Sequence, residues 1–209
     1  IGILFLSAIA QAQEPTIMLR YRPRDWLIYS LEFSPKSQVL ASVESSPARE
    51  ETYSFVTLWD VRGMKERFRL AHNSFPIWDL EFSPDGSKIV TASFDRTAKI
   101  WDVNTGNLLF NIDDHIGWVA FASWSPDSKK IATASWDNSI IIFDTESGQI
   151  NQKLQDHTDN VETVYWSPDG KKILSADYDG QVIIYEVKTG HILHQFKKTD
   201  RFRSTAYFK

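Results

Sequence analysis

The chain has 209 residues, a net charge of −4 and no cysteine. This length is enough for one substantial domain. The mildly acidic balance gives no general attraction to nucleic acid or to an anionic membrane, so we expect no nucleic-acid partner. The lack of cysteine excludes disulfide bonds, thiol catalysis and cysteine–zinc sites.

The chain begins with an apolar segment, 1–12, of sequence IGILFLSAIAQA. It leads into Ala10-Gln11-Ala12, which has the small-x-small form of a signal cleavage site. The pattern predicts a signal-peptide remnant cut before Gln13, and therefore a protein exported from a bacterial cytoplasm, either periplasmic or secreted. The run is too short to cross a bilayer, so no membrane span is expected in the mature part. The alternatives are an apolar first strand of the domain and a cytoplasmic location.

A repeat organises the rest of the chain. Residues 83–102, SPDGSKIVTASFDRTAKIWD, predict a turn, a strand, a second turn and a second strand. In the first turn Pro84 presets φ and Gly86 supplies a positive φ. An aromatic residue and an acid close each unit at a spacing of 42 residues, which indicates a repeat architecture. The closing pairs are Trp59-Asp60, Trp101-Asp102, Phe143-Asp144 and Tyr185-Glu186.

The period predicts four units of four strands each. Ahead of them, the N-terminal segment 13–24 holds a short β-compatible stretch at 16–21. The first unit carries seven extra residues, and its polar segment 44–51 predicts a surface loop. Segment 197–209 predicts the first strand of a fifth, truncated unit. Only neighbouring units can cover the apolar faces of such a unit, and the units at the two ends would lack a neighbour on one side. We therefore expect the chain to be a fragment of a longer protein. The four predicted units are 25–70, 71–112, 113–154 and 155–196.

Three features that share the period resemble the WD-repeat β-propellers, over residues 16–209. The repeat of that family carries a Gly-His dipeptide, a turn Asp and a closing Trp-Asp. The resemblance implies an all-β fold, a β-propeller of four-stranded antiparallel blades, here an incomplete ring of about seven blades. It also implies that the strand at 16–21 closes the ring. The matching positions are Ala71-His72, Asp114-His115 and Asp156-His157, with turn aspartates Asp95, Asp137 and Asp179.

The resemblance also implies a hydrogen-bonded network inside each blade, made by a His, a strand Ser or Thr, the turn Asp and the Trp. A buried indole N–H needs an acceptor, and the Asp fixes the tautomer of the His. By position, the network of the second unit is His72, Ser93, Asp95 and Trp101. The other units depart from it. The third unit offers His115, Ser135 and Asp137, but Phe143 replaces the Trp. The fourth unit offers His157 and Asp179; Asp177 replaces the Ser, and Tyr185 replaces the Trp, for which its hydroxyl partly substitutes. In the first unit Arg24 stands near the His position and Tyr53 at the Asp position.

Large aromatic residues flank the turn Asp. Phe94, Trp136 and Tyr178 each precede it directly, and the family resemblance places such positions on the rim where partners bind. Aromatic side chains offer much contact area with few rotatable bonds, as binding surfaces do. The alternative is that they pack between blades. Further rim candidates are Trp78, Tyr29 and Trp118.

No catalytic residues, metal site or cofactor are predicted. The three repeated histidines fall on successive units, and no helical metal-binding spacing, nucleophile motif or phosphate loop is present. The sequence therefore favours a non-catalytic scaffold that binds proteins or peptides on the propeller rim. Two alternatives stay open. One is a propeller hydrolase, or the docking module of a larger enzyme, and the other is an architectural protein of the cell envelope.

Overall fold

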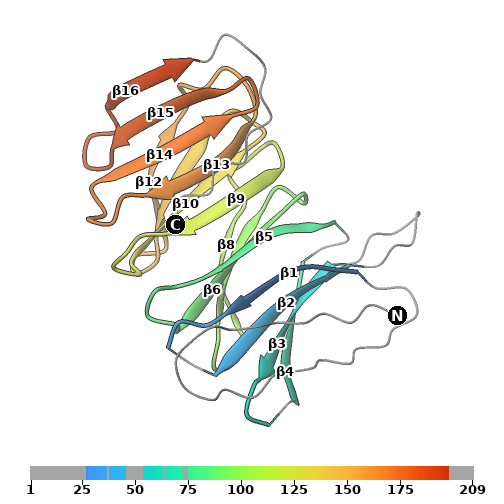
Figure 1. Cartoon of the computed structure of the whole chain (residues 1–209). Helices are drawn as coiled ribbons and strands as arrows, with labels where there is room; N and C mark the ends of the chain where they lie inside the picture. The colour runs from blue at the N-terminus through green and yellow to red at the C-terminus, as the bar shows by residue number, and fades with distance from the viewer. Residues whose placement is uncertain (1–26, 37, 46–53, 64, 73–74, 198–209) are drawn as a thin grey trace, which may run out of the picture.

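The computed structural model describes residues 27–36, 38–45, 54–63, 65–72 and 75–197. Its secondary structure in this part of the chain consists of strands only, sixteen of them, in four antiparallel sheets that follow one another along the chain (Figure 1). The fold is therefore all-β, built from four-stranded antiparallel sheets. The predicted signal remnant and ring-closing strand, and all but the first residue of segment 197–209, lie outside the described residues.

The four sheets share one strand order, in which chain neighbours are also sheet neighbours. The first holds β1 (Leu27–Phe33), β2 (Val39–Ser45), β3 (Ser54–Asp60) and β4 (Lys65–Ala71). The second holds β5 (Ile77–Phe82), β6 (Lys88–Ser93), β7 (Ala98–Asp102) and β8 (Leu108–Ile112). The third holds β9 (Val119–Trp124), β10 (Lys130–Ser135), β11 (Ile140–Asp144) and β12 (Gln149–Leu154). The fourth holds β13 (Val161–Trp166), β14 (Lys172–Asp177), β15 (Gln181–Glu186) and β16 (Ile192–Lys197).

The Ser-Pro turn explains why each first hairpin closes where it does. In the turn between β5 and β6, Ser83 Oγ donates to Asp85 Oδ1 at 2.6 Å and accepts from Lys88 N at 2.9 Å. Gly86 has a φ of 72°, and its N–H donates to Ser83 O at 2.7 Å. A side chain at this glycine would also come within 2.8 Å of Ser34 Oγ in the first sheet. The turn therefore needs glycine both for its backbone and for the approach of the neighbouring sheet.

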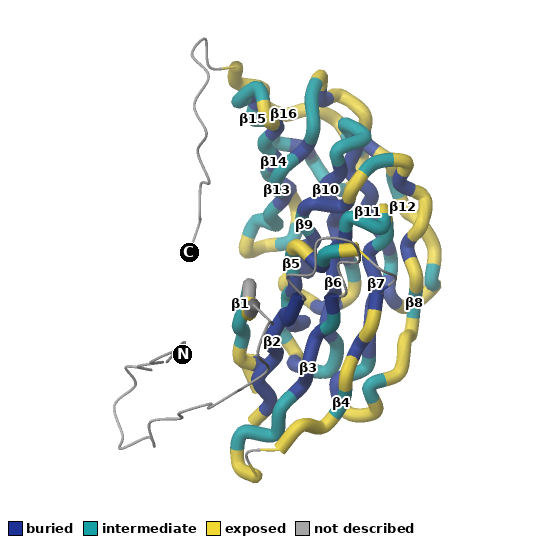
Figure 2. The backbone as a smooth tube through the Cα atoms, turned by 90° about the vertical axis from the view of Figure 1, so that its right-hand side faces the viewer, coloured by how far each residue is buried: buried dark blue, intermediate teal, exposed yellow. Residues whose placement is uncertain are grey.

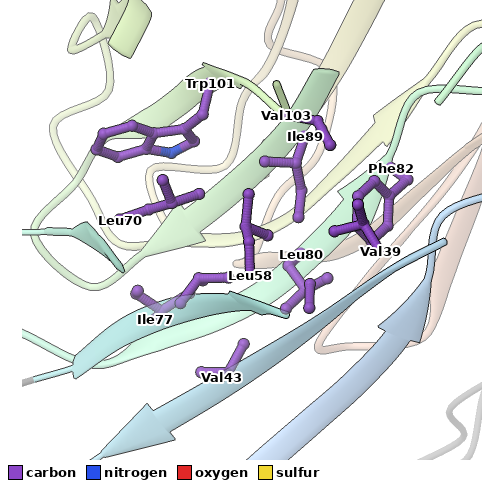
Figure 3. Close-up of a cluster of buried hydrophobic side chains, with 12 residues drawn as sticks. Val39, Val43, Leu58, Leu70, Ile77, Leu80, Phe82, Ile89, Trp101 and Val103 are labelled. Carbon is purple, nitrogen blue, oxygen red and sulfur yellow. The ribbon is translucent and has the colours of Figure 1, made fainter. Parts of the chain in front are cut away.

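The hydrophobic core lies between successive sheets. In the cluster of Figure 3, Val39, Val43, Leu58 and Leu70 of the first sheet meet Ile77, Leu80, Phe82, Ile89, Trp101 and Val103 of the second. Two further clusters join the second sheet to the third and the third to the fourth in the same way. The outer strands β4, β8 and β12 are largely exposed, whereas the strands beside them are buried (Figure 2). Each sheet is thus stabilised mainly by its neighbours.

Three carboxylates on the inner strands also tie the sheets together. Glu32 of β1 accepts from Phe82 N at 3.2 Å, Asp79 of β5 accepts from Ala122 N at 3.2 Å, and Glu81 accepts from Trp124 N at 2.6 Å. Burial raises the pKa of Glu32 and of Asp79 to about 7 and that of Glu81 to about 8. Their mutual repulsion adds to this effect. These acids therefore exchange protons close to neutral pH.

The predicted loop at 44–51 begins too early. Glu44 and Ser45 form the end of β2 and are buried, with exposed fractions of 1% and 2%. Glu44 is held there because its Oε1 accepts from Ser42 Oγ at 2.8 Å. The other residues of the predicted loop lie outside the described residues.

Candidate functional site

A buried chain of hydrogen bonds connects the strands of the second sheet to its turns. His72 Nδ1 lies 3.1 Å from Asp95 Oδ2, and His72 Nε2 lies 2.6 Å from Thr91 Oγ1. Trp101 Nε1 donates to the same Thr91 hydroxyl at 3.0 Å. Asp95 Oδ1 also accepts from Thr97 N at 2.9 Å, which closes the turn between β6 and β7.

The charges of this network follow from its burial. Burial lowers the pKa of His72 and outweighs the opposing effect of Asp95. Burial alone would raise the pKa of Asp95, but the hydrogen bonds from His72 and Thr97 lower it well below its ordinary value. His72 is therefore neutral beside an ionised Asp95, with its proton on Nδ1. Its Nε2 then accepts from the Thr91 hydroxyl, whose oxygen accepts from Trp101.

The structure corrects the predicted strand residue of the network. Thr91, two residues before Ser93, holds His72 and Trp101 together, whereas Ser93 Oγ donates to Pro76 O at 3.0 Å and accepts from Asp95 N at 3.1 Å. Both residues face the same side of β6, but only Thr91 lies level with the indole. In the third sheet Thr133 likewise replaces the predicted Ser135, with Thr133 Oγ1 at 2.8 Å from His115 Nε2.

The third and fourth sheets keep the histidine but change its partners. His115 Nδ1 lies 3.0 Å from Asp137 Oδ2, while Phe143 stands at the Trp position. In the fourth sheet His157 Nδ1 lies 3.0 Å from Asp177 Oδ2, not beside the predicted Asp179. Asp177 occupies the strand position of Ser93, and its longer carboxylate reaches both His157 and Gln181 N, the latter at 2.8 Å.

Tyr185 does not take over the role of the indole. Its side chain is fully buried, and its hydroxyl interacts with Asp156 rather than with the His157–Ser175 pair. Burial, with Asp156 nearby, raises the pKa of Tyr185. Ser175, at the position of Thr91, instead meets His157 Nε2 at 2.7 Å without help from Tyr185.

The first sheet has a partial network that the sequence analysis missed. Trp59 Nε1 donates to Ser42 Oγ at 2.9 Å, and Ser42 bonds the buried Glu44. Glu44 stands at the register position of Ser93 and Asp177, so aligning the four units with the insertion removed would have found it. Arg24 and Tyr53, the residues predicted in its place, lie outside the described residues.

The networks hold two sets of loops together at one end of the sheets. The turn residues Phe94, Trp136 and Tyr178 each donate a backbone N–H to the loop before the inner strand. Their acceptors are the carbonyls of Pro76, Trp118 and Asn160, at 3.0, 2.8 and 2.9 Å respectively. The side chains at this end therefore project from backbone segments that are hydrogen-bonded to each other.

Four of the predicted rim aromatics form one continuous series of ring contacts at this end, which we call the aromatic stripe: Trp78, Phe94, Trp118 and Trp136. Trp78 and Phe94 stack with centroids 4.8 Å apart, and Phe94 and Trp118 with centroids 4.2 Å apart across two sheets. Trp118 and Trp136 follow at 4.7 Å. Trp78 is 57% exposed and Trp118 is 39% exposed, so the stripe presents aromatic area to solvent.

The aromatic stripe as defined above leaves two predicted rim residues aside, Tyr178 and Tyr29. Tyr178 is 52% exposed at the matching turn of the fourth sheet. Tyr29 lies in β1, and its side chain is outside the described part of the structure. The four residues of the aromatic stripe thus come from the second and third sheets.

One acidic residue at the stripe was not predicted. Glu162 of β13 stands two repeats after Trp78 in the register and is half-buried beside the Trp136 indole. Burial raises the pKa of Glu162, although the indole N–H opposes this. Among the described residues neither Glu162 Oε1 nor Trp136 Nε1 has a partner in hydrogen-bonding geometry. Register alignment with Trp78 is the signal that would have pointed to it.

Several known proteins are similar to parts of this chain. WD repeat and SOCS box-containing protein 1 of Homo sapiens is 38% identical over 66 residues, which cover 31% of this chain and 16% of that protein. Ribosome assembly protein 4 of Chaetomium thermophilum is 42% identical over 60 residues, 26% of this chain and 12% of that protein. Eukaryotic translation initiation factor 3 subunit I of Caenorhabditis elegans is 50% identical over 42 residues, 20% of this chain and 12% of that protein. The matched segments thus span less than a fifth of these relatives.

These relatives correct the prediction of export. Ribosome assembly and translation initiation take place inside the cell, so the relatives point to the cytoplasm or nucleus rather than to a periplasmic or secreted protein. The prediction rested on segment 1–12, which lies outside the described residues. Within the described ranges no helix is long and apolar enough to cross a membrane.

Two family profiles match the chain at the sheets described above. The WD domain, G-beta repeat, matches residues 64–102, which contain the complete network of the second sheet. The anaphase-promoting complex subunit 4 WD40 domain matches residues 124–205. Together with the four-stranded antiparallel sheets and the relatives that carry WD repeats, these matches show that the chain belongs to the WD-repeat family, and its sheets are the blades of a WD-repeat β-propeller.

Proposed function

We propose that the protein is a non-catalytic scaffold whose aromatic stripe binds a protein or peptide partner. The observation that carries the proposal is the exposure of two tryptophans, Trp78 at the start of β5 and Trp118 in the loop before β9. The backbone beside each is hydrogen-bonded to the facing turn of its own sheet, through Pro76 O and Trp118 O. Aromatic side chains held rigidly at a surface contribute most of the binding energy of many interfaces, because little side-chain entropy is lost. WD-repeat proteins typically bind protein partners, which agrees with this reading.

The structure offers less support for the alternatives. The three repeated histidines, His72, His115 and His157, are buried and bonded to their own blades, so they are not presented to a substrate. Among the described residues no group of three acidic or histidine side chains is placed to hold a metal ion. A hydrolase, or a docking module for one, and an architectural envelope protein each lack an observation of this kind in their favour.

The proposal is tested by selecting binding peptides from a randomised peptide display library on the folded chain. We expect Trp118→Ala to weaken binding of the selected peptides by about 10- to 100-fold, since a central aromatic anchor is worth roughly 2 kcal/mol or more. Fluorescence anisotropy with labelled peptides measures the effect. The matched control is Phe196→Ala, which removes an aromatic ring that is 58% exposed on β16. Equal affinities of the wild type and Trp118→Ala for every selected peptide would overturn the proposal.

A further inference from the structure

We propose that the aromatic stripe and Glu162 together form a site for an arginine side chain of the partner. This inference rests on the proposed function and names the chemistry of its ligand. The guanidinium would stack on the exposed indole of Trp118 and direct its N–H donors to the Glu162 carboxylate.

Glu162 lies at one end of the aromatic stripe. The stripe runs from Trp78 through Phe94 and Trp118 to Trp136, and Glu162 of the next blade lies directly beside Trp136. Asp159, in the loop before β13, is near enough to raise the pKa of Glu162 by repulsion. Two carboxyl groups, those of Glu162 and Asp159, therefore lie at one end of the aromatic stripe.

The Glu162 carboxyl group also has room for a further hydrogen-bond donor. Glu162 Oε1 is buried and, within the described residues, has no donor. Leaving a buried carboxylate oxygen without a donor is costly, and a charged donor from a partner would remove that cost. The Trp136 indole N–H beside it lowers the pKa of Glu162, but it does not meet the geometry of a full hydrogen bond to Oε1.

An arginine side chain suits this combination of rings and carboxyl group better than a lysine or a nucleic acid. Arginine is planar, stacks on aromatic faces and keeps its N–H groups free at the edge, so it can satisfy an indole face and a carboxylate at once. A lysine ammonium is a compact, strongly hydrated charge and makes fewer directed bonds. Single-stranded nucleic acid also stacks on aromatic rings, but its phosphates would meet Glu162 and Asp159 in a chain of net charge −4.

The test is a double-mutant cycle between the protein and a selected peptide. Its four arms are wild type and Glu162→Gln, each with the labelled peptide carrying Arg or Gln at the enriched basic position. We expect each single change to weaken binding by about 10- to 100-fold, and both together to weaken it no more than either alone. Glu146→Gln is the matched control, because Glu146 is an exposed acid in the turn between β11 and β12, at the opposite end of the neighbouring third blade.

Each outcome decides the matter. Coupled losses support the arginine site. Peptides that need Trp118 but carry no basic residue, or losses that simply add, overturn the arginine site and leave the proposed function standing. If the library yields no peptide that depends on Trp118, both fall. A labelled oligouridine that binds more tightly than the peptides, and is lost in Trp118→Ala, also overturns the proposal, since the stripe would then stack bases.

Discussion

Thr91→Val is expected to lower the free energy of unfolding by roughly 2 to 4 kcal/mol, because it removes one buried hydroxyl that serves two partners. The Trp101 N–H would lose its acceptor and the His72 Nε2 would lose its donor, both inside the blade. Valine has nearly the same volume as threonine, so no cavity accompanies the loss of the hydroxyl. Urea unfolding followed by Trp fluorescence measures the change.

Two controls separate this network from simple strand packing. Thr91→Ser keeps the hydroxyl and is expected to cost much less than Thr91→Val. Ser93→Ala removes only the bonds to Pro76 O and Asp95 N, and should cost about 1 kcal/mol. A larger loss in Ser93→Ala than in Thr91→Val would contradict the network described above.

Stability is expected to fall as the pH rises from about 6.5 to 8, because the folded chain keeps protons on Glu81, Glu32 and Asp79 that the unfolded chain has already released. Burial raises the pKa of Glu81 from its ordinary value of 4.5 to about 8 in the folded chain. The folded state therefore holds its proton over a range in which the unfolded state has released it, and the stabilising contribution is lost as the pH rises through 8. Burial lowers the pKa values of His72 and His157, so below pH 6.5 these residues make stability rise with pH, which is the opposite direction.

Glu81→Gln isolates this effect. Glutamine keeps an oxygen that can accept from Trp124 N but carries no charge. We expect the variant to be more stable than the wild type by about 2 kcal/mol at pH 8, and to show no gain at pH 4, where Glu81 is protonated in both states. Glu66→Gln, on the exposed outer strand β4, is the control. A constant difference between the two proteins from pH 4 to pH 8 would be inconsistent with a raised pKa.

The sheets could be predicted because their signals are local. Ser83, Pro84 and Gly86 act within one turn, and a period of 42 residues repeats them with their strands. The network could be predicted only in outline. Thr91 and Ser93 alternate onto the same face of β6, so spacing alone does not show which hydroxyl lies level with Trp101. For the same reason the sequence predicted Asp179 as the partner of His157, whereas Asp177, two residues earlier, is the partner in the structure.

Contacts between blades are harder to predict than contacts within them. The sequence named the aromatic residues of the rim, but not that Phe94 stacks on Trp118 of the following blade. It also missed Glu162, because an acid two repeats away from Trp78 carries no motif of its own. The prediction of export rested on a short apolar run, 1–12, whose composition suits a signal segment and a buried strand equally.

We expect the selected peptides to bind at the aromatic stripe. The most direct test is NMR of the indole N–H groups of the eight tryptophans, recorded with and without a selected peptide. The account predicts that the signals of Trp78, Trp118 and Trp136 shift, while those of the indoles hydrogen-bonded inside and between the blades, Trp59, Trp101, Trp124 and Trp166, stay in place. Shifts confined to the second group, or bound peptide without a shift in the first, would contradict it.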